Sequence, residues 1–290
     1  MDLHTLLQVV VNGVLLGGVY ALMALGINLV FGVMRVVNLA HGDFIMVGGF
    51  LTFWLFSQFG LSPLLALPLA ATLGFALGGL VQWGLLRHLP RDLDPTRSSL
   101  LITFGVSYLV VNAAHLIWGS EYQTVSAVTG SWQVAGVQIA RTRALAFAVA
   151  ALVTALVWAF LRYTDLGRAV RAISQNLEGA AVCGIDVPRL RLFTFGLGSA
   201  LATAAGAIVV MIFAVQPAIG GSLTLKSFAI AAIGGLGSFP GALLGAMVLG
   251  LAEVFSGVFA SAQVANGVAF VLFLLVLLLR PGGLLARRGV

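Results

Sequence analysis

Long apolar runs separated by short polar segments recur along the whole chain. Several runs exceed the roughly 18 consecutive apolar residues that indicate a membrane-crossing helix. Nine runs can be drawn, at 6–34, 44–60, 63–86, 98–118, 143–161, 192–214, 227–239, 241–259 and 264–279. This pattern predicts an all-α, polytopic transmembrane helical bundle of about eight to nine membrane segments, forming a single domain over residues 1–290.

The composition excludes the main soluble classes. Hydrophobic residues make up 60% of the chain and charged residues 8%, whereas a soluble domain usually carries about 25% charged residues. So few charges cannot cover a soluble globule, which argues against a soluble enzyme, a nucleic-acid-binding domain and a disordered chain. The single Cys183 excludes an internal disulfide, and no His, Cys or carboxylate set has metal-ligand spacing, so we expect neither metal nor cofactor.

The basic residues sit in short loops between the runs, where they set membrane orientation. They gather in three places: after the fifth run (Arg162, Arg168, Arg171, Arg189, Arg191), before the fourth (Arg87, Arg91, Arg97) and at the C-terminus (Arg280, Arg287, Arg288). The positive-inside rule makes all three cytoplasmic and places the stretch 119–140, which has no Lys or Arg, outside. The opening run has no basic residue before Arg35, so we expect a retained span and not a cleaved signal peptide.

The run at 227–239 is the weakest candidate for a span. Its 13 residues would reach only about 20 Å as a helix, against a hydrocarbon core of roughly 30 Å. An even number of crossings must nevertheless separate Arg191 from a cytoplasmic tail, so we expect this run to cross as a short or broken helix buried among its neighbours. Nine crossings put the N-terminus outside, and a re-entrant first or seventh run would reduce the number to eight.

Small residues four apart let helix backbones approach closely in lipid. Such sets are Gly13, Gly17 and Ala21; Ala70, Gly74 and Gly78; Gly198, Ala202 and Gly206; and Gly237, Gly241 and Gly245. We interpret the first three sets as helix packing. The fourth overlaps Gly234, Gly235, Ser238 and Pro240 in the shortest run, and interrupted short segments of this kind also occur at transport sites, so packing and a pathway role both remain open there.

Residues 162–191 hold 8 of the chain's 24 charged residues and have helical apolar spacing at Val170, Ile173, Leu177 and Ala180. They predict an amphipathic cytoplasmic helix, with Asp165 as its N-cap and Gly184 at its end. Its apolar face requires a cover, which is either the membrane surface, the protein's own helix ends or the groove of a partner.

Four stretches carry a resemblance to a known family. Glu178-Gly179-Ala180 with Gly184 resembles the E-A-A-x-x-x-G coupling loop of bacterial ABC importer permeases, with Gly179 in place of the first alanine. The LivH/LivM branched-chain amino acid permeases have motifs similar to three further stretches, namely Asn38-Leu39-Ala40-His41-Gly42-Asp43, Gly167-Arg168-Ala169 through Asn176, and Gly234-Gly235-Leu236-Gly237-Ser238-Phe239-Pro240-Gly241-Ala242 with the tail Arg280-Pro281-Gly282-Gly283-Leu284.

The resemblance implies an ABC importer permease fold in the bacterial inner membrane. Such permeases pair, usually as a LivH-like and a LivM-like chain, with two cytoplasmic ATP-binding subunits and a periplasmic solute-binding protein. The segment 162–191 would then contain the coupling helix, with Glu178, Ala180 and Gly184 carrying the general importer motif and Arg168, Arg171 and Asn176 the variant of this family.

The chain lacks its own motor and the common signatures of catalysis. A phosphate-binding P-loop ends in G-K-[ST], but the only lysine, Lys226, follows Leu225. No G-x-S-x-G nucleophile elbow appears either. We therefore expect a transport subunit that is not an enzyme, with ATP hydrolysed on a partner chain.

Three ionisable residues are candidates for function, because polar groups at membrane depth are costly unless paired or wetted. His41 and Asp43 cluster with Arg35 and Asn38 at a break near the interface, where we expect them to cap a helix start. Glu253 lies inside the eighth run with no basic residue nearby in sequence, and lining the pathway or bonding across helices are both open. A proton-coupled secondary transporter using these three residues is the alternative of a different class.

The solute is less well defined than the class. A pathway with few buried charges suits a neutral or zwitterionic solute, which includes branched-chain or other hydrophobic amino acids but also urea and short amides. The pathway candidates are Asn38, His41, Gly42, Asp43, Gly234, Gly235, Gly237, Ser238, Gly241 and Glu253.

Overall fold

The computed structural model describes residues 3–88, 95–134, 136–280 and 282–285. Its elements are α1 (Leu3–Met34), α2 (His41–Phe59), α3 (Pro63–Gly84), the 3-10 turn η1 (Leu86–His88), α4 (Pro95–Trp118), β1 (Ser131–Val134), β2 (Val137–Ala140), α5 (Arg141–Tyr163), α6 (Asp165–Gln175), α7 (Leu177–Val182), α8 (Val187–Val209), α9 (Ile219–Gly234), α10 (Phe239–Phe259) and α11 (Ala262–Leu279). Arg91, Pro281, Arg287, Arg288 and the C-terminal end of the chain lie outside the described residues.

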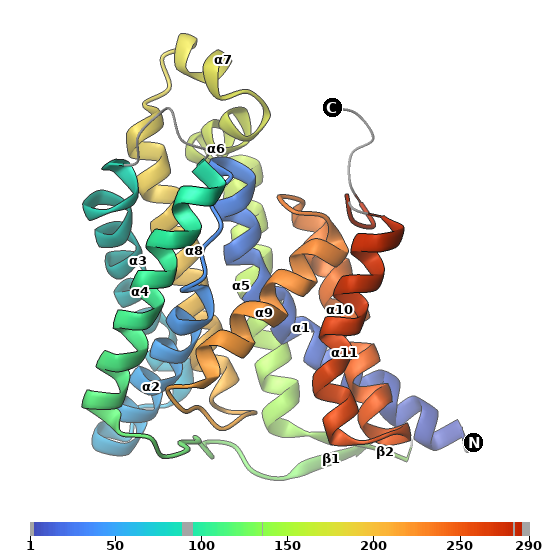
Figure 1. Cartoon of the computed structure of the whole chain (residues 1–290). Coiled ribbons are helices and arrows are strands. Elements are labelled where there is room, and N and C mark those ends of the chain that lie inside the picture. Colours follow the sequence, from blue (N-terminus) through green and yellow to red (C-terminus); the bar gives the residue numbers. More distant parts are fainter. Residues whose placement is uncertain (1–2, 89–94, 135, 281, 286–290) are drawn as a thin grey trace.

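The described part of the chain is an all-α bundle whose apolar helices run between two ends (Figure 1). Seven helices are long and apolar enough to cross a membrane, and two apolar helices, Ile219–Gly234 and Gln263–Leu279, are shorter. The helices α1, α2 and α8 are the most buried and form the centre, whereas α3, α4, α5 and α10 expose most of their apolar side chains around it. The predicted fold class is confirmed.

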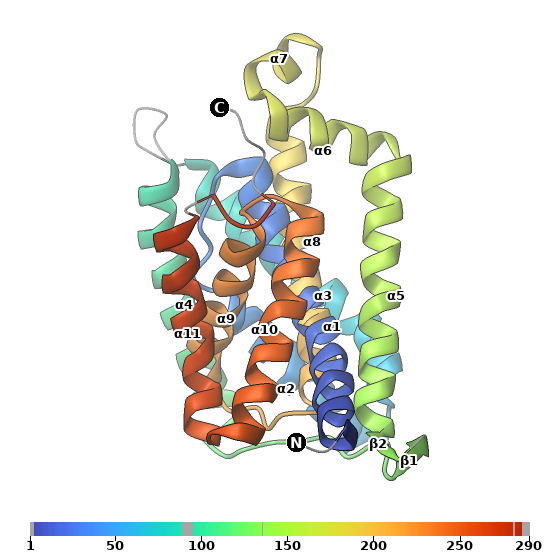
Figure 2. The ribbon, with the colours of Figure 1, turned by 90° about the vertical axis from the view of Figure 1, so that its right-hand side faces the viewer.

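The two ends of the bundle differ in the loops that they carry. The C-terminal ends of α3, α5 and α11 lie at the same end as α6 and α7, and the start of α1 lies at the opposite end with the antiparallel pair β1 and β2 (Figures 1 and 2). The described loops that we predicted to be cytoplasmic thus share one end. The helices α8 to α11 alternate in direction, as the parity argument required.

The connection between α1 and α2 runs inside the bundle. At 32 residues, α1 is about 48 Å long, whereas the 19 residues of α2 reach only about 28 Å. The non-helical segment 35–40 covers the remainder, so α2 starts at mid-depth (Figure 1). Its free backbone groups are bonded by α4, since Val37 N donates to Ser99 Oγ (3.2 Å) and Thr103 Oγ1 donates to Val37 O (3.1 Å). Non-helical backbone at this depth requires such internal partners.

This geometry corrects the expected position of the residues at the break. His41 is 1% exposed and Asp43 is fully buried, so neither lies at the interface. Neither caps the helix, because the N-cap residue of α2 is Ala40 and no side chain makes a capping hydrogen bond there. Sequence hydropathy placed them at the surface because it treats a polar cluster between two runs as a loop.

The structure also corrects both ends of the short run predicted at 227–239. The helix α9 begins at Ile219, eight residues before the predicted start, and ends at Gly234. The first half was missed because it contains polar residues, among them Ser222, Thr224 and Lys226, that the bundle accommodates. The predicted end was too late because Gly235 (φ 107°) and Gly237 (φ 80°) adopt backbone conformations that stop a helix.

Small residues lie where the helices cross. A Cβ atom added at Gly74 or Gly78 in α3 would lie 2.1 Å or 2.3 Å from hydroxyl oxygens of α8, and one added at Gly198 would lie 2.5 Å from Val30 in α1. A Cβ atom at Gly17 would lie 3.0 Å from Met247 in α10. The packing interpretation of the first three glycine sets is confirmed, since backbones this close leave no room for larger side chains.

Adjacent glycines in α3 provide a matched test of this packing. A Cβ atom at Gly78 would meet Ser199 Oγ at 2.3 Å and its Cβ at 2.6 Å, whereas one at Gly79 meets nothing within 4 Å. We expect Gly78→Ala to lower the stability of the detergent-solubilised protein by about 1–3 kcal/mol, as overpacking does. Thermal unfolding measures this, with Gly79→Ala as control, and equal melting temperatures for the two variants would contradict the packing model.

Candidate translocation cavity and coupling segment

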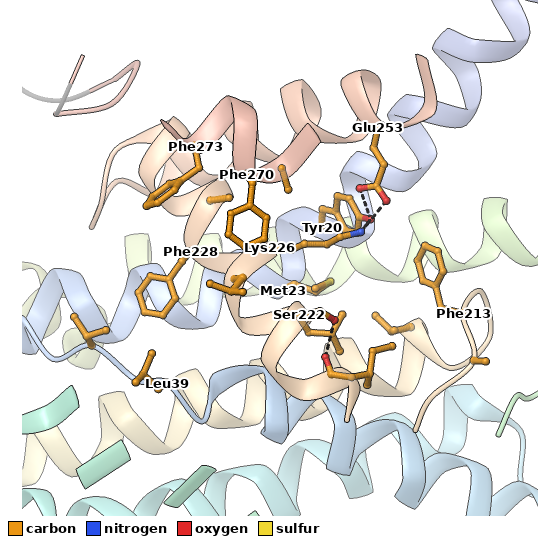
Figure 3. A pocket seen from close by; sticks show the side chains of 18 residues that line it. Tyr20, Met23, Leu39, Phe213, Ser222, Lys226, Phe228, Glu253, Phe270 and Phe273 are labelled. Atoms are coloured by element: carbon orange, nitrogen blue, oxygen red, sulfur yellow. Dashed lines mark hydrogen bonds and ion pairs between the residues drawn. The ribbon is translucent and has the colours of Figure 1, made fainter. Parts of the chain in front are cut away.

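A cavity of about 640 Å³ opens between α1, α9, α10 and α11 (Figure 3). Its wall is mostly apolar and includes four phenylalanine side chains, Phe213, Phe228, Phe270 and Phe273, together with Leu39 of the segment that precedes α2. Cavities of this size and character are typical of sites for small organic molecules.

Three polar side chains meet on the wall of this cavity. Lys226 Nζ of α9 donates to Glu253 Oε1 of α10 at 2.7 Å and to the hydroxyl oxygen of Tyr20 at 3.1 Å. The Tyr20 hydroxyl, from α1, donates in turn to Glu253 Oε2 at 2.8 Å. The lysine and glutamate side chains are only 18% and 11% exposed. We call Tyr20, Lys226 and Glu253 the polar triad (Figure 3).

The polar triad shows that Glu253 is hydrogen-bonded across helices and also lies on the cavity wall. An isolated charge in an apolar interior is strongly disfavoured, and it persists there only when it is paired and hydrogen-bonded. The partner of Glu253 is 27 residues away in sequence, and the bonded tyrosine is 233 residues away. Sequence reasoning weighed Lys226 only as a P-loop residue and passed over Tyr20. An ionisable side chain in an apolar stretch was the signal that pointed to Lys226.

The residues around the start of α2 have other partners. His41 Nε2 lies 2.8 Å from Met23 O, and Asn38 Oδ1 accepts from Ala40 N at 3.1 Å. Gly42 N donates to Thr224 Oγ1 at 2.8 Å, and a Cβ atom added at Gly42 would lie 2.0 Å from Gly220 O. These contacts join α2 tightly to α9.

Asn38, His41, Gly42 and Asp43 are not among the described residues that line the cavity. The fold therefore does not gather His41, Asp43 and Glu253 into one site.

The glycines of the late motif lie in and beside the turn between α9 and α10. Gly237 N donates to Asn28 Oδ1 of α1 at 2.9 Å, and Ser238 Oγ caps α10 by accepting from Gly241 N at 3.1 Å. A Cβ atom at Gly234 would lie 1.9 Å from Gly241 O, so the two helices touch through backbone. These glycines, with Gly235, lie away from the cavity lining and join α9, α10 and α1 to one another.

The segment 162–191 folds into two helices instead of the single one predicted. Thr164, not Asp165, caps α6, because its Oγ1 accepts from Gly167 N at 3.0 Å. The helical conformation is interrupted at Asn176. The extended backbone of this residue ends α6, and its Oδ1 accepts a hydrogen bond from Gly179 N at 2.9 Å and so caps α7. Gly184, with φ 82°, follows the end of α7 as predicted.

The two helices present different surfaces. The apolar side chains Val170 and Ile173 of α6 and Ala180 of α7 are buried, and α6 contacts α1, α5 and α8, so the protein's own helices cover this face. On α7, Glu178 is exposed and Val182 is 88% exposed. Arg168, paired with Asp165, and Arg171 also face outward. The helix α7 projects beyond the rest of the bundle (Figures 1 and 2).

An apolar bundle of this kind, with a cavity and one projecting helical segment, has the features expected of a membrane-spanning permease. The family model for the branched-chain amino acid transport system permease component matches residues 9–279, and the chain belongs to that family.

Known proteins of the family are similar over nearly the full length. The high-affinity branched-chain amino acid transport system permease protein LivH of Escherichia coli K12 is 33% identical, with 98% of this chain and 96% of that protein aligned. The corresponding permease BraD of Pseudomonas aeruginosa is also 33% identical, over 100% and 98%. The solved structure of PsaBC from Streptococcus pneumoniae shares the fold, with a TM-score of 0.51 at 14% identity, covering 95% of this chain and 92% of that one.

The triad makes a prediction about stability. Lys226→Met leaves the Glu253 carboxylate without its cation, and we expect a loss of about 3–5 kcal/mol, as for other buried pairs that lose one partner. The double variant Lys226→Met/Glu253→Gln removes both charges and should be more stable than either single variant. Denaturant unfolding in detergent measures this cycle, and additive effects of the two substitutions would rule out a coupled pair.

Proposed function

We propose that the chain is the membrane-spanning subunit of an ATP-driven importer that moves branched-chain or other hydrophobic amino acids across the bacterial inner membrane. Full-length similarity to LivH and BraD supports the transport class. The observation that carries the solute class is the cavity, whose wall joins apolar and aromatic side chains to one charged pair. An apolar wall of this kind favours aliphatic amino acids over urea or short amides.

The motor in this proposal is a pair of separate cytoplasmic ATPases. The exposed helix α7 with Glu178 would seat in a cleft of one ATPase, and α6 would pass the movement on because it contacts α1, α5 and α8. Two of these helices border the cavity region, since Tyr20 belongs to α1 and Val209 ends α8. Closure of the ATPases would rotate helices around the cavity and alternate its access between the two membrane faces.

The remaining partners follow from the same proposal. A second permease chain, LivM-like in the family arrangement, would complete the passage beside the open cavity, and a periplasmic binding protein would deliver solute at the end that carries β1 and β2. The end with α6 and α7 would face the cytoplasm, in accordance with its arginines.

Charge reversal on α7 tests the coupling role. We expect Glu178→Lys to reduce ATP-dependent uptake by the reconstituted importer to background, because the reversed charge faces the docking surface. Gly184→Leu should act similarly, since φ 82° at this position is unfavourable for leucine. Uptake of radiolabelled leucine into proteoliposomes is the measurement, with membrane insertion checked for each variant.

The matched control for α7 is Arg87→Glu, which reverses an exposed charge at the same end of the bundle, in η1 after α3. Transport should remain near the wild-type rate in this variant. The coupling role would be wrong if the Glu178→Lys variant bound the ATPases normally and still carried out uptake.

The energy source distinguishes this function from proton-coupled transport. Uptake should continue when a protonophore collapses the proton gradient while internal ATP is maintained, because no step of the proposed cycle requires a proton. Depletion of ATP with the gradient intact should stop uptake. The opposite pattern would favour a secondary transporter.

A further inference from the structure

We propose that the polar triad is a recognition site for the zwitterionic head of an aliphatic amino acid. In this site Lys226 binds the carboxylate of the ligand, Glu253 binds its ammonium group, and the ligand's side chain lies among the aromatic residues of the cavity. This inference rests on the proposed function and deepens it, since it names the residues that contact the solute inside the membrane.

The charge arrangement of the triad complements a zwitterion. Lys226 Nζ and Glu253 Oε1 lie 2.7 Å apart and present one positive and one negative group side by side. An α-amino acid likewise carries one charge of each sign on adjacent groups, so the two dipoles can align antiparallel. Moving a zwitterion away from water is costly unless both of its charges are compensated. A wall with an ion pair provides that compensation and leaves the cavity neutral in both the empty and the loaded state.

The triad also has hydrogen-bonding capacity to spare. A lysine ammonium has three N–H donors, and the contacts described here, to Glu253 and Tyr20, occupy two of them. A carboxylate has about four acceptor positions, and Glu253 accepts one bond at each oxygen, from Lys226 and from Tyr20. A ligand can therefore bind both charges without breaking the pair that holds α1, α9 and α10 together.

The position of the triad fits this role. Its charged groups are partly accessible from a cavity of about 640 Å³, which is within the range of small-molecule sites. Phe228, Phe270 and Phe273 lie around the same space (Figure 3) and provide apolar surface for an aliphatic side chain. The opposing model is that the ion pair only fastens helices, in which case apolar contacts alone would retain a ligand.

Protection of an introduced thiol separates these models. Ser222 lines the cavity one helical turn before Lys226 on α9 and is exposed to it. The chain's single cysteine, Cys183, is removed as Cys183→Ser, and Ser222→Cys then places one thiol beside the triad with little change in size. The assay follows the rate of N-ethylmaleimide labelling of this permease chain, in membrane vesicles that hold the whole importer.

We expect leucine at saturation to slow labelling by about tenfold, while 4-methylpentanoate and isoamylamine, which each lack one of the two charged groups, protect little. A hydrogen bond to a charged group is worth about a factor of ten or more. The proposal is overturned if leucine does not protect, or if either analogue protects as well as leucine does.

The matched variant is Lys226→Met/Glu253→Gln in the same background, which removes both charges without leaving one unpaired. Protection by leucine should be lost there, and leucine uptake should fall at least about tenfold for the same reason. Unchanged protection in this variant would show that the ion pair has only a structural role. Thr72→Val, which removes an exposed hydroxyl on α3 away from the residues that line the cavity, should transport normally.

The two levels of inference fail in different ways. If wild-type vesicles show no ATP-driven leucine uptake, the proposed function is wrong. If that uptake is intact but the analogues protect equally, the importer assignment stands and the zwitterion site is rejected.

Discussion

The hydrocarbon core of a membrane offers no hydrogen bonds, and the structure of this permease is arranged around that constraint. A polar group at depth is costly unless the protein itself provides a partner. The non-helical segment 35–40 before α2 is hydrogen-bonded to Ser99 and Thr103 of α4. Lys226, the single lysine of the chain, is hydrogen-bonded to Glu253 and Tyr20. Each such pairing also binds two or three helices together, so the same contacts satisfy polar groups and define the packing.

The constraint also explains how polar and small residues are distributed. Lipid provides no hydrophobic force between helices, so close backbone packing has to hold them together. Glycines accordingly lie at the contacts of α3 with α8 and of α9 with α10. The central helices α1, α2 and α8 are thereby packed closely together, whereas the cavity lies towards α9 and α11 at their side. In the proposed transport cycle, movement of α6 would reach this centre through its contacts with α1 and α8.

How far the sequence predicts the fold depends on whether the signal is local. Apolar runs longer than a membrane crossing are local, so the number of helices and the ends on which their basic loops lie were predicted well. The bounds of α9 were not, because Ser222, Thr224 and Lys226 lower the hydropathy of a helix that the bundle nevertheless accommodates. The break at Asn176 was missed because amphipathic spacing continues across it, and only the cap on Gly179 N reveals two helices.

The sequence by itself determined the class of protein, the approximate spans and the amphipathic character of the segment 162–191, since each depends on composition, motifs or local spacing. It also singled out Glu253 as an unpaired acid. Only the tertiary structure decided what that acid does, because its partners Lys226 and Tyr20 come from two other helices. Contacts between helices far apart in the chain follow from packing, and no periodicity along the sequence records them. The burial of His41 and Asp43 was decided in the same way, by the depth at which α2 begins.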